Sequence, residues 1–296
     1  MIGSPRPGRP GDLAALRELL TEEVRLNRRD SVPGGTQLGQ RMAGFDWESR
    51  SRVIENGEGP RAIALVTARE TAEGTVGRVE VAGRDRSDRL ELLRWGLALS
   101  RAAGARVGQV WQPSGCREGM AELGLSPARP FWRMDRSNLE DLPATRLPAE
   151  YQLAEGPPWR VAADTYNRAF EEHWRHSPLS PDLPPEQRPR DLELLAVTRE
   201  AKPAALAWGE LEEHDAAVDR RPQPVGIVGV VGTLPQHRRR GLGSALTAEA
   251  LRRLRGRGAR SASLYVDGLN PTRAYDVYRR LGFEVAYEYE VFEARW

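Results

Sequence analysis

Apolar positions recur along the first half of the chain with helical and strand periods. Leucines at helical spacing predict helices over residues 13–27 and 88–105, and a shorter helix is predicted over 116–126. Short apolar runs predict strands around residues 61–84, 106–112 and 127–136. The segment 138–150 then breaks the pattern with prolines and acidic residues, which is typical of a linker.

A second series of elements follows the linker. The pattern predicts helices over 161–174, 241–257 and 274–282, strands over 192–200, 204–213, 224–234 and 261–267, and a closing strand pair or bent strand over 283–294. Leu242, Leu246, Leu251 and Leu254 share one broad face of the helix 241–257. We therefore expect domains at 1–140 and 151–296, joined by a linker at 141–150.

Two short matches indicate that the halves are related. RAAGAR (residues 101–106) matches RGRGAR (255–260) at an offset of 154, and MAELGL (120–125) matches YRRLGF (278–283) at 158. The order helix, strand, helix, strand is the same around both matches. Chance similarity in a chain rich in arginine, alanine and glycine is the alternative. The favoured interpretation is two copies of one α/β domain.

Composition narrows the class of protein. The net charge is only +2 over 296 residues, which argues against a dedicated nucleic-acid protein. Cys116 is the single cysteine, so the chain has no intramolecular disulfide and no cysteine metal cluster. The first residues lack the apolar core of a signal peptide, and no apolar run approaches the roughly 18 residues of a membrane span. We expect a cytoplasmic protein without a membrane partner or a bound metal.

The stretch PQHRRRGLGSAL, residues 235–246, carries the clearest candidate chemistry. A strand, a glycine-rich turn and a helix in succession form a phosphate site, because glycines admit close backbone approach and free amides point out of the helix start. Arg238, Arg239 and Arg240 add formal charge. Alone, the pattern is also compatible with a capped surface helix whose arginines are solvated.

The wider context resembles the GNAT superfamily of acyl-CoA-dependent N-acyltransferases. Pro235, Arg238, Gly241 and Gly243 reproduce the spacing P-x-x-R-x-x-G-x-G, and NPTRAYDVYRRLGF (residues 270–283) is similar to the closing motif of that family. The resemblance covers residues 150–296 well and the first half weakly. It implies an α/β (α+β) fold of two tandem GNAT-like domains, each with a mixed, mostly antiparallel sheet flanked by helices.

The resemblance also implies site residues. Acetyl-CoA would be the acyl donor, Tyr278 would be the general acid that protonates the departing thiolate, and a backbone amide near Thr233 would polarise the thioester carbonyl. The implied contacts to the donor involve Thr233, Leu234, Arg238, Arg239, Arg240, Gly241, Leu242, Gly243, Ser244, Asn270 and Arg273.

The general base is less clear. The strand GIVGVVGT has no acid or histidine, so Glu210 on the preceding strand is the candidate, with Glu212, Asp267 and a water chain as alternatives. His173 and His176 could serve as base or line the acceptor site, since the family resemblance places their region over it. Residues 175–191 and 213–224 would shape that pocket.

The first half lacks the motif residues. At the offset of 154, Gly241 and Gly243 fall opposite Ser87 and Arg89, whereas Leu92 matches Leu246. We therefore expect a non-catalytic first domain. The expected activity is acetylation of a small-molecule amine; acetylation of a protein amine and a non-catalytic acyl-CoA sensor are alternatives. The oligomeric state, including a homodimer, is left open.

Overall fold

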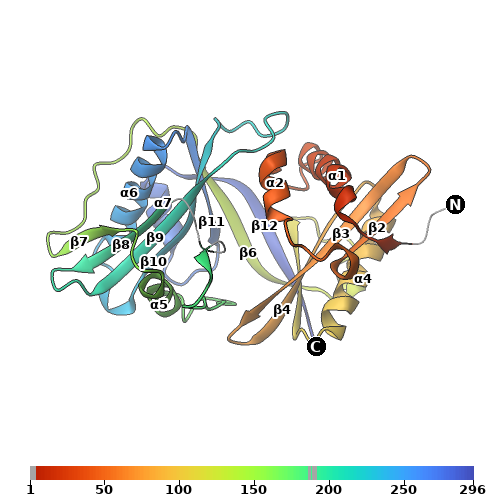
Figure 1. The fold of residues 1–296 in the computed structure, drawn as a ribbon, viewed down its shortest axis with the longest axis horizontal. Coiled ribbons are helices and arrows are strands. Elements are labelled where there is room, and N and C mark those ends of the chain that lie inside the picture. The colour runs from red at the N-terminus through yellow and green to blue at the C-terminus, as the bar shows by residue number, and fades with distance from the viewer. Residues whose placement is uncertain (1–4, 186–187, 189–191) are drawn as a thin grey trace. The chain divides into compact units, whose positions relative to one another are not determined.

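The computed structural model describes residues 5–185, 188 and 192–296 (Figure 1). The chain forms two compact units. Unit 1 comprises Met1–Phe131, His214–Arg220 and Tyr287–Trp296, and unit 2 comprises Trp132–Glu213 and Arg221–Ala286. We had expected continuous domains at 1–140 and 151–296. The observed units instead take short segments from each other's part of the sequence.

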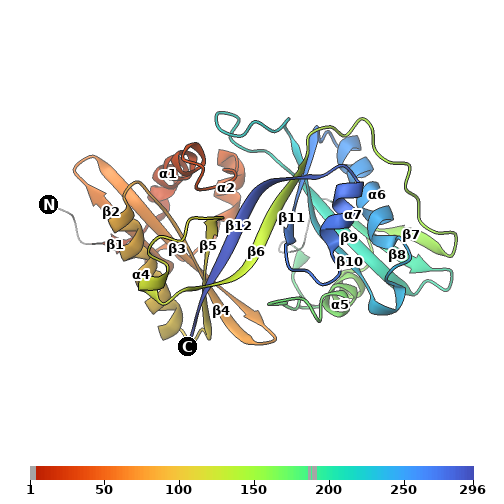
Figure 2. The same cartoon turned by 180° about the vertical axis from the view of Figure 1, so that it is seen from behind.

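Unit 1 is built on a sheet whose strands follow the order β1-β2-β3-β4-β5-β12. All its neighbouring strands are antiparallel except β4 and β5, which are parallel. Helix α4 packs on one face of β3 and β4, and α1 on the other (Figures 1 and 2). The elements are β1 (Arg6–Pro7), η1 (Pro10–Asp12), α1 (Leu13–Arg25), α2 (Gly35–Arg41), α3 (Trp47–Arg50), β2 (Ser51–Asn56), β3 (Gly59–Thr71), β4 (Gly74–Gly83), α4 (Arg86–Ala102), β5 (Val107–Pro113), η2 (Ala121–Leu123) and most of β12 (Glu284–Arg295).

Unit 2 has the strand order β6-β11-β10-β9-β8-β7. Strands β10 and β11 are parallel, and β7 to β10 pair antiparallel in sequence order. Helix α6 covers one face of β9 and β10, and α5 covers the other. The elements are the end of β6 (Ser126–Arg136), β7 (Tyr151–Glu155), α5 (Trp159–Ala169), β8 (Leu192–Thr198), β9 (Pro203–Glu212), β10 (Val225–Thr233), η4 (Pro235–His237), α6 (Leu242–Gly256), β11 (Ser261–Asp267) and α7 (Ala274–Arg280).

The internal repeat is present in three dimensions. Each unit contains a strand, a helix and a second, parallel strand: β4-α4-β5 in unit 1 and β10-α6-β11 in unit 2. Leu92 and Leu246, which the sequence match aligned, are both fully buried on these helices. The four leucines predicted on one face of α6 are buried as well. Both units therefore use the repeated apolar positions for the same packing.

Some elements differ from the sequence-based expectation. The helix predicted over 116–126 is only a 3-10 turn, η2. Gly119 and Gly124, which flank this turn, have positive φ values of 78° and 70°. That conformation interrupts a helix. Strand β2, helix α2 and strand β7 were not predicted, since their short runs carry weak periodicity. Residues 283–294 form one continuous strand, β12, rather than a pair.

Segment His214–Arg220 illustrates why the sequence could not place every loop. It follows β9 in the chain but docks within unit 1, where His214 bridges Pro33 and the Asp215 amide donates to the Val32 carbonyl at 3.0 Å. Only part of the predicted pocket loop 213–224 therefore belongs to unit 2. No helix in the described part of the chain is long and apolar enough to cross a membrane.

Candidate active site

The basic stretch forms the connection between β10 and α6. Leu234 is buried, its amide donates to the Ala204 carbonyl at 2.9 Å, and Pro235 starts the short turn η4. Arg239 and Gly241 adopt positive φ angles of 61° and 81°, and Gly241 is the N-cap of α6. Left-handed residues in such a turn direct successive amides to one side, as in an anion-binding nest.

The amides of this turn are left without internal acceptors. The Arg238 amide donates to the Pro235 carbonyl, and the Ala245 amide donates to the Gly241 carbonyl. The backbone amides between them, at residues 239–244, donate no hydrogen bond to any other described residue. The first turn of a 15-residue helix adds the positive end of its dipole. Arg239 and Arg240 are exposed beside it. The turn therefore presents free donors and positive charge together, as a phosphate site requires.

Neither the backbone conformation nor the neighbouring atoms require glycine at position 243. A Cβ added there would meet only Val231 Cγ1 at 3.9 Å and Thr233 Oγ1 at 4.0 Å, which is ordinary contact. Its φ is not in the left-handed region. The absence of a side chain consequently favours close approach of something outside the fold.

Beside this turn, the two parallel strands separate. β10 pairs with β11 only from Val225 to Ile227, opposite Ser261 to Ser263, yet β10 continues to Thr233. On its other edge β10 pairs with β9 as far as Thr233, with a register shift between Val228 and Val230. Alternate backbone groups of the last six residues of β10 therefore face an edge where strand pairing has ended. Such an edge can accept an extended ligand as an added strand.

Of the three arginines, Arg238 faces inward. Its guanidinium donates to the carbonyls of Thr233 and Ala169 and to Glu172, each at 3.3 Å. It ties the turn to the end of β10 and to α5. Its side chain thus holds the turn in place, whereas Arg239 and Arg240 keep theirs exposed.

Tyr278 lies half-buried on α7 and packs against Phe283, with ring centroids 6.2 Å apart. Burial raises the pKa of Tyr278 to about 12. Its hydroxyl makes no hydrogen bond to any other described residue. A neutral phenol with an uncommitted proton suits a general acid.

Asn270 and Arg273, predicted to contact the donor, are engaged within the turn before α7. Asn270 Oδ1 accepts from the Thr272 amide at 2.9 Å and from the Thr272 hydroxyl at 2.7 Å. Arg273 Nε donates to Asp276 at 2.8 Å. Both side chains shape the start of α7, and their role toward a ligand stays a prediction.

The predicted base, Glu210, lies on the face of the sheet that α5 covers, and the two predicted histidines follow α5 in the chain. Glu210 is exposed on β9, opposite Ile227, and two residues from Trp208, so both side chains share this face. Trp208 stacks on Tyr166 of α5, with centroids 5.3 Å apart. The His176 ring lies 5.4 Å from that of Tyr166. Aromatic rings and polar groups consequently gather here.

The two histidines differ in environment. His173 Nδ1 lies 3.0 Å from the Trp174 carbonyl oxygen, and its ring meets Phe170 edge to face. His176 Nδ1 is buried without a hydrogen-bond partner. Burial, and secondarily His173, lowers the pKa of His176. Burial thus favours the neutral imidazole of His176, which leaves Nδ1 available for a hydrogen bond to a ligand. Part of the predicted pocket loop 175–191 lies outside the described residues.

Two features of this site escaped the sequence reasoning. Glu193 on β8 lies directly opposite Trp208 and so shares the same face, and burial raises the pKa of its carboxyl group. The alternation of LELL could have placed it. His237 Nδ1 lies 3.0 Å from the hydroxyl of Tyr151, and burial and then Arg240 lower the His237 pKa. This contact anchors η4 to β7, and no sequence signal indicates it.

The equivalent place in unit 1 is closed to anions. Only Arg84 and Asp85 separate β4 from α4, and Asp88, in the first turn of the helix, is buried and pairs with Arg61 at 3.1 Å. Glu23 Oε1 accepts the amide of Gly83 at the end of β4. Carboxylates of the protein itself therefore occupy the helix start and the strand end. This supports the expectation that unit 1 is non-catalytic.

Comparison with known proteins agrees with the geometry. A family model described as FR47-like protein matches residues 210–292. A mycothiol acetyltransferase of Nocardia farcinica is 34% identical over 214 residues, which cover 65% of this chain and 67% of that protein. A mycothiol acetyltransferase of Kytococcus sedentarius is 30% identical over 188 residues, 58% of this chain and 59% of the relative. The chain thus spans little more than half the length of some curated relatives it matches.

Solved structures share the fold over the whole chain. A GCN5-related N-acetyltransferase from Sphaerobacter thermophilus superposes with a TM-score of 0.79 at 22% identity, covering 99% of this chain and 95% of that one. A tandem GNAT protein from the clavulanic acid biosynthesis pathway gives 0.72 at 15% identity, covering 99% and 98%.

The fold, the internal repeat and the turn between β10 and α6 define a tandem α/β protein with a candidate phosphate site in its second unit. The chain belongs to the GNAT family, in its tandem-domain form. The tandem architecture predicted from the repeat is confirmed.

The buried environment of Tyr278 predicts that its phenol loses its proton at a higher pH than an exposed tyrosine does. Because its folded pKa of about 12 exceeds the value near 10 of an unfolded tyrosine, stabilisation by the neutral phenol is complete below about pH 10 and is lost as pH rises through about 12. Ultraviolet difference titration of the wild type minus Tyr278→Phe should yield one phenolate with a midpoint well above 10. Circular dichroism over the same range verifies that the chain stays folded. A midpoint at or below 10 would contradict the buried environment.

Proposed function

We propose that the protein transfers an acetyl group from acetyl-CoA to a primary amine of a small molecule, by direct attack in a ternary complex. The run of free amides at residues 239–244 carries the proposal, because it forms a diphosphate site at the end of a strand whose edge is open. Family membership and the GNAT structural neighbours support it.

The donor would lie across the turn and along β10. The diphosphate accepts hydrogen bonds from the amides of residues 239–244, with Arg239 and Arg240 supplying charge. The pantetheine arm runs beside residues 230–234, where β10 has parted from β11, and binds to its free edge as a strand would. Thr233 lies at the end of this edge, where an amide can polarise the thioester carbonyl.

The reaction is an aminolysis of the thioester. The neutral amine nitrogen attacks the carbonyl carbon, a C–N bond forms, and the C–S bond breaks. Tyr278, whose phenol is protonated at neutral pH, gives its proton to the departing thiolate as the C–S bond breaks. The amine loses one proton to a base or through water.

Two carboxylates can take that proton. Glu210, the predicted base, is exposed on β9 opposite Ile227 of β10. Glu193 lies one strand further, opposite Trp208, with a raised pKa. Glu210 is the nearer of the two to β10, since adjacent strands lie about 4.8 Å apart. Ile227 is six residues from Thr233, roughly 20 Å along an extended strand, so we assign the base role to Glu210 acting through a chain of waters.

The α5 face supports a small-molecule acceptor. Trp208 and Tyr166 provide an aromatic surface, and Glu193 and Glu210 provide negative charge beside it. This combination suits a compact cationic amine, since aromatic faces and carboxylates both attract ammonium groups. The name of these relatives, mycothiol acetyltransferase, also favours a small-molecule acceptor.

Gly243→Val should weaken acetyl-CoA binding by at least about tenfold, because the added side chain blocks close approach of the diphosphate to the amides. Calorimetry measures the affinity and should give one site per chain for the wild type. Gly256→Val, at the exposed end of the same helix, is the matched control. Unchanged affinity in Gly243→Val, or two equivalent sites per chain, would refute the assignment of donor site or silent unit.

Tyr278→Phe should lower kcat by about 10²-fold while acetyl-CoA affinity stays nearly constant, since the hydroxyl acts on the leaving thiolate. Release of free CoA measures turnover with a panel of small amines, and single-turnover kinetics show whether chemistry limits the rate. An undiminished chemical step would remove Tyr278 from the mechanism.

Glu210→Gln should reduce kcat/KM by about 10²-fold, because the neutral amide cannot accept the amine proton. Glu193→Gln, on the same face of the neighbouring strand, is the comparison variant and should lose less than about threefold. The opposite ranking would transfer the base role to Glu193. Equal, small losses would favour loss of the proton to water alone.

A further inference from the structure

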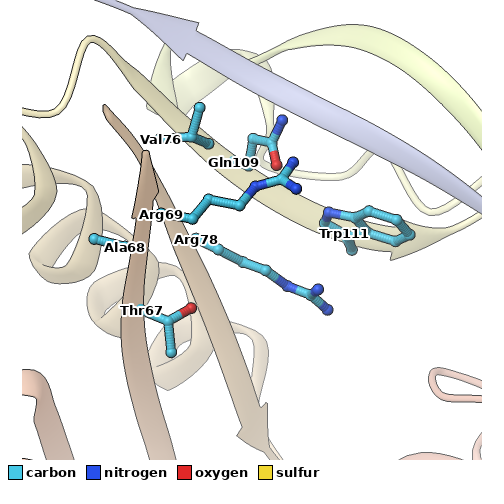
Figure 3. Close-up of a pocket in the computed structure, with 7 residues that line it drawn as sticks. All are labelled: Thr67, Ala68, Arg69, Val76, Arg78, Gln109 and Trp111. Carbon is cyan, nitrogen blue, oxygen red and sulfur yellow. The ribbon is translucent and has the colours of Figure 1, made fainter. Parts of the chain in front are cut away.

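A cavity lies within unit 1, away from every element of the proposed reaction. It encloses about 190 Å³ over the strands β3, β4 and β5. Arg69 of β3, Arg78 of β4 and Trp111 of β5 line it, with Gln109 at its edge (Figure 3). Along the strands, Arg69 and Arg78 alternate in phase with Ile63 and Ala82, which pack on α1. The cavity therefore opens on the α1 side of the sheet.

Two buried donors in this cavity have no acceptor. Trp111 Nε1 and Arg78 Nε are both shielded from solvent, and neither forms a hydrogen bond with any part of the chain that the structure describes. Buried N–H groups are almost always paired, so two unpaired donors on one cavity need an explanation. Figure 3 shows the indole nitrogen of Trp111 on the side of the ring that faces the arginine side chains.

Side-chain movement within the fold does not easily satisfy these donors. The indole of Trp111 is held by Phe131, with centroids 4.7 Å apart, by Tyr289 at 5.9 Å, and by the Arg78 guanidinium 4.8 Å from its ring centre. Tight packing of a rigid ring on several sides fixes where its N–H points.

The nearby carboxylates already have partners. Glu80 accepts from Arg78 Nη2 at 2.7 Å and lies 3.7 Å from Arg29. Glu293 Oε1 accepts from Gln109 Nε2 at 2.8 Å. The side chains that could have served as acceptors consequently leave Trp111 Nε1 and Arg78 Nε unmatched.

The lining is rich in donors and positive charge. Two guanidinium groups and an indole N–H converge, and arginine is the residue best suited to planar, multidentate contact with oxyanions. The volume is below the range of about 300–1,000 Å³ typical of drug-sized ligands. A small ligand with an oxyanion group fits both the chemistry and the size.

We propose that this cavity binds the carboxylate or phosphate group of a small molecule. The Arg78 side chain, which is 41% exposed, would move off the indole, so that Trp111 Nε1 and Arg78 Nε donate to the oxygens of the ligand and Arg69 contributes charge. The site belongs to unit 1, whereas the donor and the catalytic residues proposed above belong to unit 2. Binding here does not depend on acetyl transfer.

The test uses the full-length protein labelled with ¹⁵N and follows the indole N–H signals of its eight tryptophans. Trp111→Phe identifies the signal of interest. Acetate and inorganic phosphate are titrated separately, each against sodium chloride at the same ionic strength. The chemical shift of the Trp111 indole proton should move downfield and reach a plateau with acetate, with phosphate or with both. The anion with the lower dissociation constant identifies the group that the cavity prefers.

Arg78→Met should raise the dissociation constant at least about tenfold while the other indole signals keep their positions. Arg84→Met, which removes an exposed arginine paired with Glu22 in the same unit, is the matched control and should bind as the wild type does. If the Trp111 signal moves no further than in sodium chloride, or if Arg78→Met and Arg84→Met behave alike, the cavity is not an oxyanion site.

Discussion

The separation of β10 from β11 is the constraint on which the candidate active site depends. The strands share only three paired positions, ending at Ile227 and Ser263, and β10 then runs on beside β9 alone. That leaves one edge of its last residues without a strand partner. The same divergence places the turn 234–241 beyond the sheet edge, where the amides of residues 239–244 can face outward.

Unit 1 shows that divergence of the strands is not sufficient to leave free amides at the end of the strand. β4 and β5 also stop pairing, after Val79 and Val110, although β4 continues to Gly83. What differs is the charge at the open end. Glu23 accepts the Gly83 amide and Asp88 sits in the first turn of α4, whereas unit 2 offers free amides and exposed arginines. The two halves therefore share a scaffold. In unit 1, carboxylates of the protein lie at the strand end and the helix start, whereas in unit 2 the corresponding amides are left free.

Local sequence signals predicted the scaffold and the turn before α6, whose phosphate-binding role stays a prediction. The leucine spacing gave α4 and α6, and the glycines and arginines of residues 235–246 gave the turn, because these features act within a few residues of one another. The inward direction of Arg238 was not predictable. Its acceptors at Ala169 and Glu172 lie more than 60 residues away in the sequence, and only folding brings them close.

The same limit explains why the most informative polar groups were missed. Burial beside Trp208 raises the pKa of Glu193. Trp111 Nε1 is buried without a hydrogen-bond partner among the described residues, on a ring that packs against Phe131 and Tyr289. Neither residue is part of a recognisable motif. The pKa or hydrogen bonding of a polar group changes when its surroundings exclude water or offer no acceptor. Those surroundings come from strands that are distant in the sequence. The alternation along β8 and β9 can place Glu193 and Glu210 on one face, whereas the burial of Glu193 and the unpaired indole nitrogen of Trp111 follow only from packing.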